Sequence, residues 1–202
     1  MLYHLVKYLS LHFDIPGAGM FLSLSFRAAM GIILALVIGM IFGKRIIRML
    51  QRRQIGEEIR NLGLEGQLQK RGTPTMGGII ILASILIPIL LFGDLTNIYV
   101  LLMIVSTVWL GLIGFLDDYI KIVMKRSEGL NPGQKLAGQI IITGIFAYYI
   151  ITSDEIGTQM LIPFTGQYLV MPVWLFVPAL FFIVLGTDNG VNFTDGLDGL
   201  CT

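Results

Sequence analysis

Long apolar segments alternate with short polar ones along most of the chain. Five of the apolar segments approach the roughly 17–25 residues that a helix needs to cross about 30 Å of hydrocarbon. They lie at residues 22–43, 77–93, 98–116, 136–152 and 172–187. Their length favours helices, because transmembrane strands are about half as long. The pattern therefore predicts an all-α, polytopic integral membrane protein, with a single transmembrane domain over residues 1–202 and five transmembrane helices.

Residues 1–21 follow a different pattern. Polar residues separate apolar side chains that recur at helical spacing, namely Leu2, Leu5, Val6, Leu9 and Phe13. This spacing predicts a short interfacial helix that lies along the membrane surface and is ended by Pro16 and Gly17. His4 and His12 lie on this segment, and we interpret both as interfacial side chains, because two lone histidines this far apart make a poor metal site.

The composition agrees with a membrane protein. Of the 202 residues, 55% are hydrophobic and 13% are charged, and the mean hydropathy is +0.80. A soluble domain carries about 25% charged residues. The only cysteine is Cys201, so no disulfide can form within the chain. We expect the lipid bilayer as surroundings and no nucleic acid as a partner.

Positive charges gather in two of the four loops between the predicted spans. Lysines and arginines fill residues 44–76 and 117–135, whereas residues 94–97 and 153–171 carry acids and no base. The positive-inside rule places the two basic loops in the cytoplasm. The N-terminus is then predicted outside. Three polar clusters are predicted on the cytoplasmic face, at residues 69–78, 114–126 and 188–199.

The second cluster, GFLDDYIKIVMKR, has two adjacent acids at the end of a span. The helix dipole disfavours carboxylates at that end, and an ionisable residue at the membrane edge suggests function. If the helix continues, Asp117, Lys121 and Lys125 share one face, with Asp118 beside Lys121. Salt bridges on a helix entering water would explain the lysines but not the acid pair. Lys121 also stands where a DDxxD motif would have its third acid, so the segment is not that motif. We predict instead that Lys121 binds a phosphate and that the two acids bind Mg²⁺ or transfer a proton.

The first and third clusters differ in strength. In QKRGTPTMGG, Thr75 is a plausible N-cap for a helix that starts at Gly77, where free amides attract anions. A plain helix start with positive-inside charge explains this cluster as well. In TDNGVNFTDGLDG, Asn192, Asp195 and Asp198 would point the same way on a helix. A calcium loop is rejected, because apolar residues occupy ligand positions and no closing glutamate follows.

Together the clusters combine carboxylates, lysines and glycine-rich helix starts on one membrane face. That combination fits Mg²⁺-assisted phosphoryl transfer, in which positioning and charge neutralisation contribute most. The substrates would be a lipid phosphate of the inner leaflet and a water-soluble nucleotide.

The motifs KRGTPTMGGI, GFLDDYIK and NGVNFTDGLDGL, in this order, closely resemble those of the phospho-N-acetylmuramoyl-pentapeptide transferase family. That family belongs to the polyprenyl-phosphate N-acetylhexosamine-1-phosphate transferase superfamily, and TPTMGG favours the muramoyl branch over related UDP-N-acetylhexosamine transferases. The resemblance covers nearly the whole chain. It implies transfer of phospho-N-acetylmuramoyl-pentapeptide from its UDP conjugate to undecaprenyl phosphate, with Mg²⁺, to give lipid I and UMP. It also implies peptidoglycan synthesis in a bacterial cytoplasmic (inner) membrane.

The resemblance also implies roles for individual residues. The family's catalytic and Mg²⁺-binding acids match Asp117, Asp118 and Asp195. Asp117 corresponds to the general base on the lipid phosphate or, in another interpretation, to the nucleophile. Substrate-binding positions match Lys70, Thr75, Lys121, Lys125, Asn192 and Asp198.

Family members have about ten membrane helices and are often dimeric. The resemblance therefore implies that this chain is the N-terminal half of the enzyme, that a further Mg²⁺ ligand follows beyond Thr202, and that a homodimer forms. A transporter or non-catalytic membrane subunit is the alternative from another class. It would place acids in the middle of a span, facing a cavity, whereas here they lie at span ends. A Mg²⁺-dependent reaction that produces UMP would separate the two.

Overall fold

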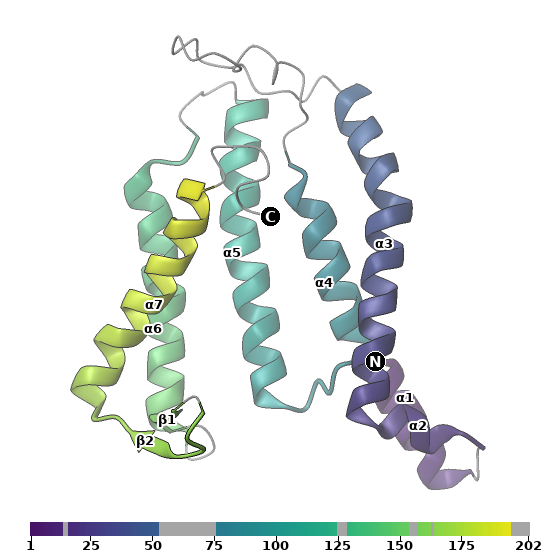
Figure 1. Ribbon diagram of the computed structural model, residues 1–202. Helices are drawn as coiled ribbons and strands as arrows, with labels where there is room; N and C mark the ends of the chain where they lie inside the picture. Colours follow the sequence, from purple (N-terminus) through teal and green to yellow (C-terminus); the bar gives the residue numbers. More distant parts are fainter. Residues whose placement is uncertain (14–15, 53–75, 125–128, 154–156, 163, 195–202) are drawn as a thin grey trace. The chain divides into compact units, whose positions relative to one another are not determined.

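The computed structural model describes residues 1–13, 16–52, 76–124, 129–153, 157–162 and 164–194 (Figure 1). They fall into two compact units, Met1–Leu130 and Asn131–Thr202, which we treat separately. The first unit contains α1 (Leu2–His12), α2 (Ala18–Leu22), α3 (Leu24–Arg52), α4 (Gly78–Phe92) and α5 (Ile98–Val123). The second contains α6 (Pro132–Thr152), β1 (Gln159–Leu161), β2 (Tyr168–Val170) and α7 (Val173–Thr194). That residues 1–202 form a single transmembrane domain stays a prediction.

The predicted class, an all-α polytopic membrane protein, is confirmed. Within the described ranges, α3, α5, α6 and α7 are long and apolar enough to cross a membrane. The segment predicted at residues 77–93 forms the shorter α4, whose 15 residues extend about 22 Å. That length is below the thickness of the hydrocarbon core, so a fifth crossing stays a prediction.

The spanning helices are longer than their apolar stretches. The span predicted to end at residue 43 continues as helix to Arg52, and the span predicted to end at residue 116 continues to Val123. In the second unit, α7 continues past residue 187 to Thr194. Each extension lies at the end of its helix that is predicted to face the cytoplasm, so the polar residues there are carried on helices.

Two short elements flank the spans. The helix predicted in residues 1–21 is confirmed as α1, and its position on the membrane surface stays a prediction. Between α6 and α7, β1 and β2 pair antiparallel, with Met160 opposite Leu169. The sequence pattern did not predict this hairpin. Its strands have three residues each, which is too short for an alternating pattern to be recognised.

Small residues bring α3 and α4 together. A Cβ added to Gly39 would lie 3.8 Å from Ser84 Oγ, and one added to Gly43 would lie 3.9 Å from Ile80 Cγ2. Such separations are ordinary van der Waals contact. Small residues at helix contacts are typical of membrane proteins, where close packing replaces the hydrophobic effect between helices.

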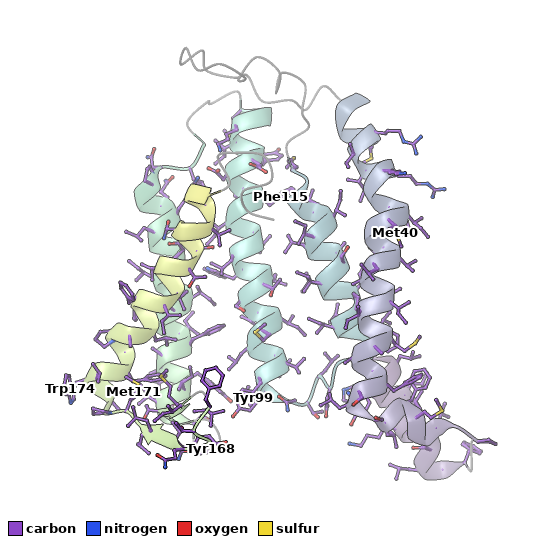
Figure 2. The ribbon with its side chains drawn as sticks, in the orientation of Figure 1. Met40, Tyr99, Phe115, Tyr168, Met171 and Trp174 are labelled. Atoms are coloured by element: carbon purple, nitrogen blue, oxygen red, sulfur yellow. The ribbon has the colours of Figure 1, made fainter. Side chains whose placement is uncertain are left out.

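Large apolar side chains cover the outside of the helices. Met40 on α3 and Trp174 on α7 project away from their helices (Figure 2), and Trp174 is 75% exposed. Tyr99 lies in the first turn of α5, while Tyr168 and Trp174 lie near the start of α7. An apolar surface with aromatic residues near helix ends is typical of a protein that contacts lipid. We therefore describe the chain as an integral membrane protein.

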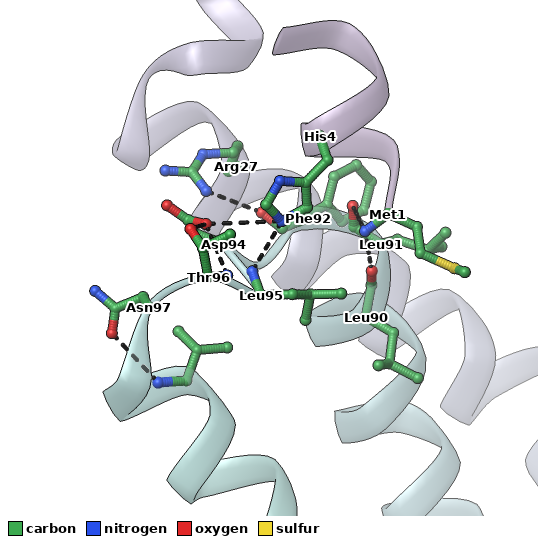
Figure 3. Close-up of polar contacts among 11 residues, drawn as sticks. Met1, His4, Arg27, Leu90, Leu91, Phe92, Asp94, Leu95, Thr96 and Asn97 are labelled. Carbon is green, nitrogen blue, oxygen red and sulfur yellow. Dashed lines mark hydrogen bonds and ion pairs between the residues drawn. The ribbon is translucent and has the colours of Figure 1, made fainter. Parts of the chain in front are cut away.

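Polar contacts attach α1 to the turn between α4 and α5 (Figure 3). The Leu95 amide donates to His4 Nε2 at 3.0 Å, and the same nitrogen lies 3.6 Å from Asp94 Oδ1. Arg27 of α3 donates from Nη1 to the Phe92 carbonyl at 3.1 Å, and its guanidinium lies 4.0 Å from the centre of the Tyr3 ring. These contacts fix one end of the first unit.

Candidate active site

The helix α5 carries the acid pair. Its N-terminus is capped by Asn97, whose side chain accepts hydrogen bonds from the Tyr99 and Val100 amides. From there 26 residues of helix extend about 39 Å. Asp117 therefore lies near the opposite end of α5, about two turns before Val123.

Asp117 is buried, with 7% of its surface exposed. Lys121 Nζ lies 3.0 Å from Asp117 Oδ2, one helical turn away. The other oxygen, Oδ1, accepts a hydrogen bond from the Leu130 amide at 2.8 Å. A buried carboxylate is costly unless it is paired and hydrogen-bonded, and here each oxygen has a donor. Asp117 and Lys121 share one helix face as predicted, and their contact is the salt bridge that the sequence left open as the alternative interpretation.

Asp118 follows Asp117 on the same helix and is half-buried. Successive helical residues are rotated by about 100°, so the two carboxylates leave α5 in different directions. Lys121 is three residues on, which is within reach of Asp118 along a helix surface. The described part of this cluster thus contains two acids and one lysine within about one turn.

A second polar cluster joins α6 to α7. Gln139 Nε2 donates to Asp188 Oδ2, and Asn189 Nδ2 donates to Gln139 Oε1 at 2.9 Å. Asn189 also donates to the Leu185 carbonyl at 2.8 Å. On α6, Thr143 is fully buried and donates to the Gln139 carbonyl. This cluster fixes the pairing of the two helices next to the motif that follows on α7.

Asp188 is the first residue of the third polar cluster, residues 188–199, but the sequence pattern predicted no role for Gln139 or Asn189. A glutamine within an otherwise apolar span is the signal that was available, because polar groups in membrane helices usually find a partner on another helix. The contribution of Leu130 could not be predicted from residue type, since its backbone amide is the donor.

The other predicted site residues are only partly described. Asn192 is exposed near the end of α7. The remaining predicted residues lie outside the described ranges: Lys70, Thr75, Lys125, Asp195 and Asp198. The prediction of Thr75 as N-cap of α4 is wrong, because this helix begins at Gly78 and its N-cap is Gly77, without a side-chain hydrogen bond. The roles assigned to these residues, and to the acid pair, stay predictions.

The donor set around Asp117 can be tested against the implied metal. In the described residues no group of three His, Cys, Asp or Glu side chains is placed to hold a metal ion. Mg²⁺ is commonly bound by only one or two carboxylates, and waters and substrate phosphates complete its octahedron. Asp117 and Asp118 supply that number of carboxylates, so the residue types present agree with Mg²⁺ bound together with a substrate phosphate.

The fold and these clusters define the chain as a polytopic membrane protein with acids and a lysine at the end of a membrane helix. Residues 100–202 match the family described as Glycosyl transferase family 4, and residues 70–82 match a pattern described as phospho-N-acetylmuramoyl-pentapeptide-transferase signature 1. The chain belongs to glycosyl transferase family 4.

Relatives named phospho-N-acetylmuramoyl-pentapeptide-transferase are similar over almost the whole chain. One from Flavobacterium psychrophilum is 44% identical over 99% of this chain and 59% of its own length. One from Parabacteroides distasonis is 44% identical, with 99% and 57% covered. One from Pelobacter propionicus is 40% identical, with 99% and 55% covered. The chain thus spans somewhat more than half the length of these relatives, and the resemblance drawn from its motifs is confirmed.

Proposed function

We propose that the chain contributes the acid pair of a Mg²⁺-dependent phosphoglycosyl transferase. The enzyme would transfer phospho-N-acetylmuramoyl-pentapeptide from its UDP conjugate to undecaprenyl phosphate, giving lipid I and UMP. The observation that carries the proposal is the buried Asp117, held by Lys121 on one oxygen and by the Leu130 amide on the other. The signature at residues 70–82 and the names of the relatives support the choice of substrates.

In this reaction an oxygen of the lipid phosphate attacks the phosphorus bonded to the sugar. A new pyrophosphate bond forms, and the bond between that phosphorus and the UMP oxygen breaks. Asp117 would accept the proton of the lipid phosphate. Lys121 lies one turn away and would neutralise charge on the same phosphate. Mg²⁺ would be held by Asp117, Asp118 and Asp195 and would stabilise charge on the transferred phosphoryl group.

The remaining assignments complete the proposal. Lys70, Thr75, Lys125, Asn192 and Asp198 would bind the substrates. The site would face the cytoplasm, because the extension of α5 that carries Asp117 and Asp118 leads into a loop rich in lysine and arginine. The alternative of a transporter is less well supported, since the relatives are named as transferases. A homodimer is proposed from the family alone.

The test is Asp117→Asn in the protein expressed from its complete reading frame, with UMP release measured in membranes. Loss of a general base typically lowers turnover by about 10²–10⁴-fold, and we expect a loss in that range with normal membrane insertion. Asp94→Asn is the matched control, because Asp94 is a carboxylate at the opposite end of α5. If Asp117→Asn releases UMP at the wild-type rate, Asp117 is not the base.

A further inference from the structure

The chain folds back onto Asp117 after α5 ends. Leu130 follows Asp117 by 13 residues, and its amide donates to Asp117 Oδ1 at 2.8 Å. This contact joins the backbone beyond α5 to the acid pair, whereas Lys121 lies on α5 itself. The orientation of the Asp117 carboxylate thus depends on how residues 129–130 are placed.

Gly129 allows this approach in two ways. Its φ is +63°, in the left-handed region that side chains disfavour. A Cβ added to Gly129 would also overlap Asp117 Oδ1 and would lie 2.8 Å from Lys121 Cε. Any other residue at this position would therefore push against both members of the Asp117–Lys121 pair.

Gly157 allows the backbone strain to be separated from the steric overlap. Gly157 has nearly the same φ, +64°, and nothing lies within 4 Å of the Cβ that a substitution would add. Alanine at Gly157 therefore meets only the backbone strain, whereas alanine at Gly129 meets the strain and the overlap with Asp117.

We propose that Gly129 and the Leu130 amide form a positioning element for Asp117, and that Gly129 is required because only a glycine leaves room for the carboxylate. This inference rests on the proposed function. Lys121 and the Leu130 amide approach different oxygens, so together they fix the rotation of the carboxylate as well as its position. A small displacement of a catalytic group can lower turnover by about 10²-fold, so a side chain at residue 129 would reduce catalysis without touching substrate.

The experiment compares Gly129→Ala with Gly157→Ala in the protein expressed from its complete reading frame. For each variant kcat and KM are measured with the UDP-linked substrate, together with the midpoint of thermal unfolding. We expect Gly129→Ala to lower kcat by about 10–100-fold with KM changed by less than about threefold, because a positioning defect affects the transition state more than substrate binding. Gly157→Ala should lower the unfolding midpoint by no more than Gly129→Ala does, because it meets only the backbone strain, and should leave kcat unchanged within about threefold.

A second variant removes the donor alone. Replacement of the Leu130 amide by an ester, introduced with the corresponding α-hydroxy acid, deletes the N–H and leaves the side chain and Gly129 in place. It should lower kcat in the same direction as Gly129→Ala, and it remains informative if Gly129→Ala does not fold.

The outcomes are distinct. Equal effects of Gly129→Ala and Gly157→Ala on kcat, or wild-type kcat in the ester variant, would overturn the positioning role while Asp117→Asn still tests the proposed function. Wild-type turnover in Asp117→Asn would overturn both.

Discussion

The contact between α6 and α7 offers a quantitative test of the structure. Gln139 is 6% exposed and bonds to both Asp188 and Asn189 on the facing helix. Gln139→Leu keeps a side chain of similar size and removes both hydrogen bonds. Asn189 retains its bond to the Leu185 carbonyl, so the main loss falls on the Asp188 carboxylate.

The expected cost follows from the two bonds. In soluble proteins a bond to a charged group contributes about 1.5–3 kcal/mol and a neutral one about 0.5–1.5 kcal/mol. Between membrane helices, measured polar contacts average about 0.6 kcal/mol and reach about 1.7 kcal/mol, because the unfolded helices also find partners. Two contacts of this kind, one of them charged, lead us to expect that Gln139→Leu lowers the free energy of unfolding by about 2 kcal/mol.

The free energy of unfolding is measured by denaturant titration in mixed micelles, on the purified protein. Thr187→Val is the matched control: Thr187 is exposed, precedes Asp188, and donates within α7 to the Ile183 carbonyl. Its cost should stay within about 0.5 kcal/mol, as for most surface substitutions. A cost for Gln139→Leu that is no larger than that of Thr187→Val would refute the assigned contact.

A double-mutant cycle makes the test specific to the pair. Gln139→Glu places a second carboxylate against Asp188 and should destabilise the protein more than Gln139→Leu. Adding Asp188→Asn supplies an amide donor to the new carboxylate and should recover more than about 1 kcal/mol. Additive effects would mean that the two side chains do not interact.

Two further predictions concern the first unit. A Cβ added to Gly111 would lie 2.8 Å from Leu82 Cδ1, whereas one added to Gly114 meets nothing within 4 Å. In the same denaturant titration, Gly111→Ala should therefore be less stable than Gly114→Ala by about 1 kcal/mol or more. Equal stabilities of the two variants would contradict the packing of α4 against α5. The Thr96 hydroxyl, with its amide, lowers the pKa of Asp94 below 3.8, despite partial desolvation. Because the folded pKa is the lower one, the stabilisation is complete above the unfolded value and is lost as pH falls through the folded value. The stability advantage of the wild type over Asp94→Asn should therefore stay constant from pH 7 to about pH 5 and shrink below about pH 4, and a constant difference down to pH 2 would count against it.

Much of the fold follows from the sequence because the membrane imposes a simple rule. A segment with no water around it must satisfy its backbone internally, so a long apolar run is a helix. The same rule does not give the helix ends. Hydropathy reports the part of a helix that lies in hydrocarbon, and it falls at Lys44 although α3 continues to Arg52. Charged residues such as these are good helix formers, so the helix extends beyond the apolar run.

The site was predictable only where it is local. Asp117 and Lys121 are four residues apart on one helix, and helical geometry alone brings them together. The contact between Asp117 and Leu130 depends on a turn after the helix, and the contact between Gln139 and Asp188 joins residues 49 positions apart. Neither contact leaves a periodic signal. The donor groups are a backbone amide and a glutamine side chain, and neither is a type of group that suggests catalysis from the sequence.

The two polar clusters have different roles: the contacts around Asp117 position a carboxylate, and the contacts around Gln139 stabilise a pair of helices. Lys121 and Leu130, which donate to Asp117, belong to the first unit, whereas the Gln139 contact lies within the second. Gln139 instead fixes α7, which carries Asn192 and leads into the segment that holds Asp195. It follows that Gly129→Ala should lower kcat, whereas Gly157→Ala should leave kcat unchanged within about threefold. Gln139→Leu should lower stability first and affect substrate binding through α7, so that KM for the UDP-linked substrate rises more than kcat falls. A kcat defect without a KM change in Gln139→Leu would show that the two clusters act on the same catalytic group.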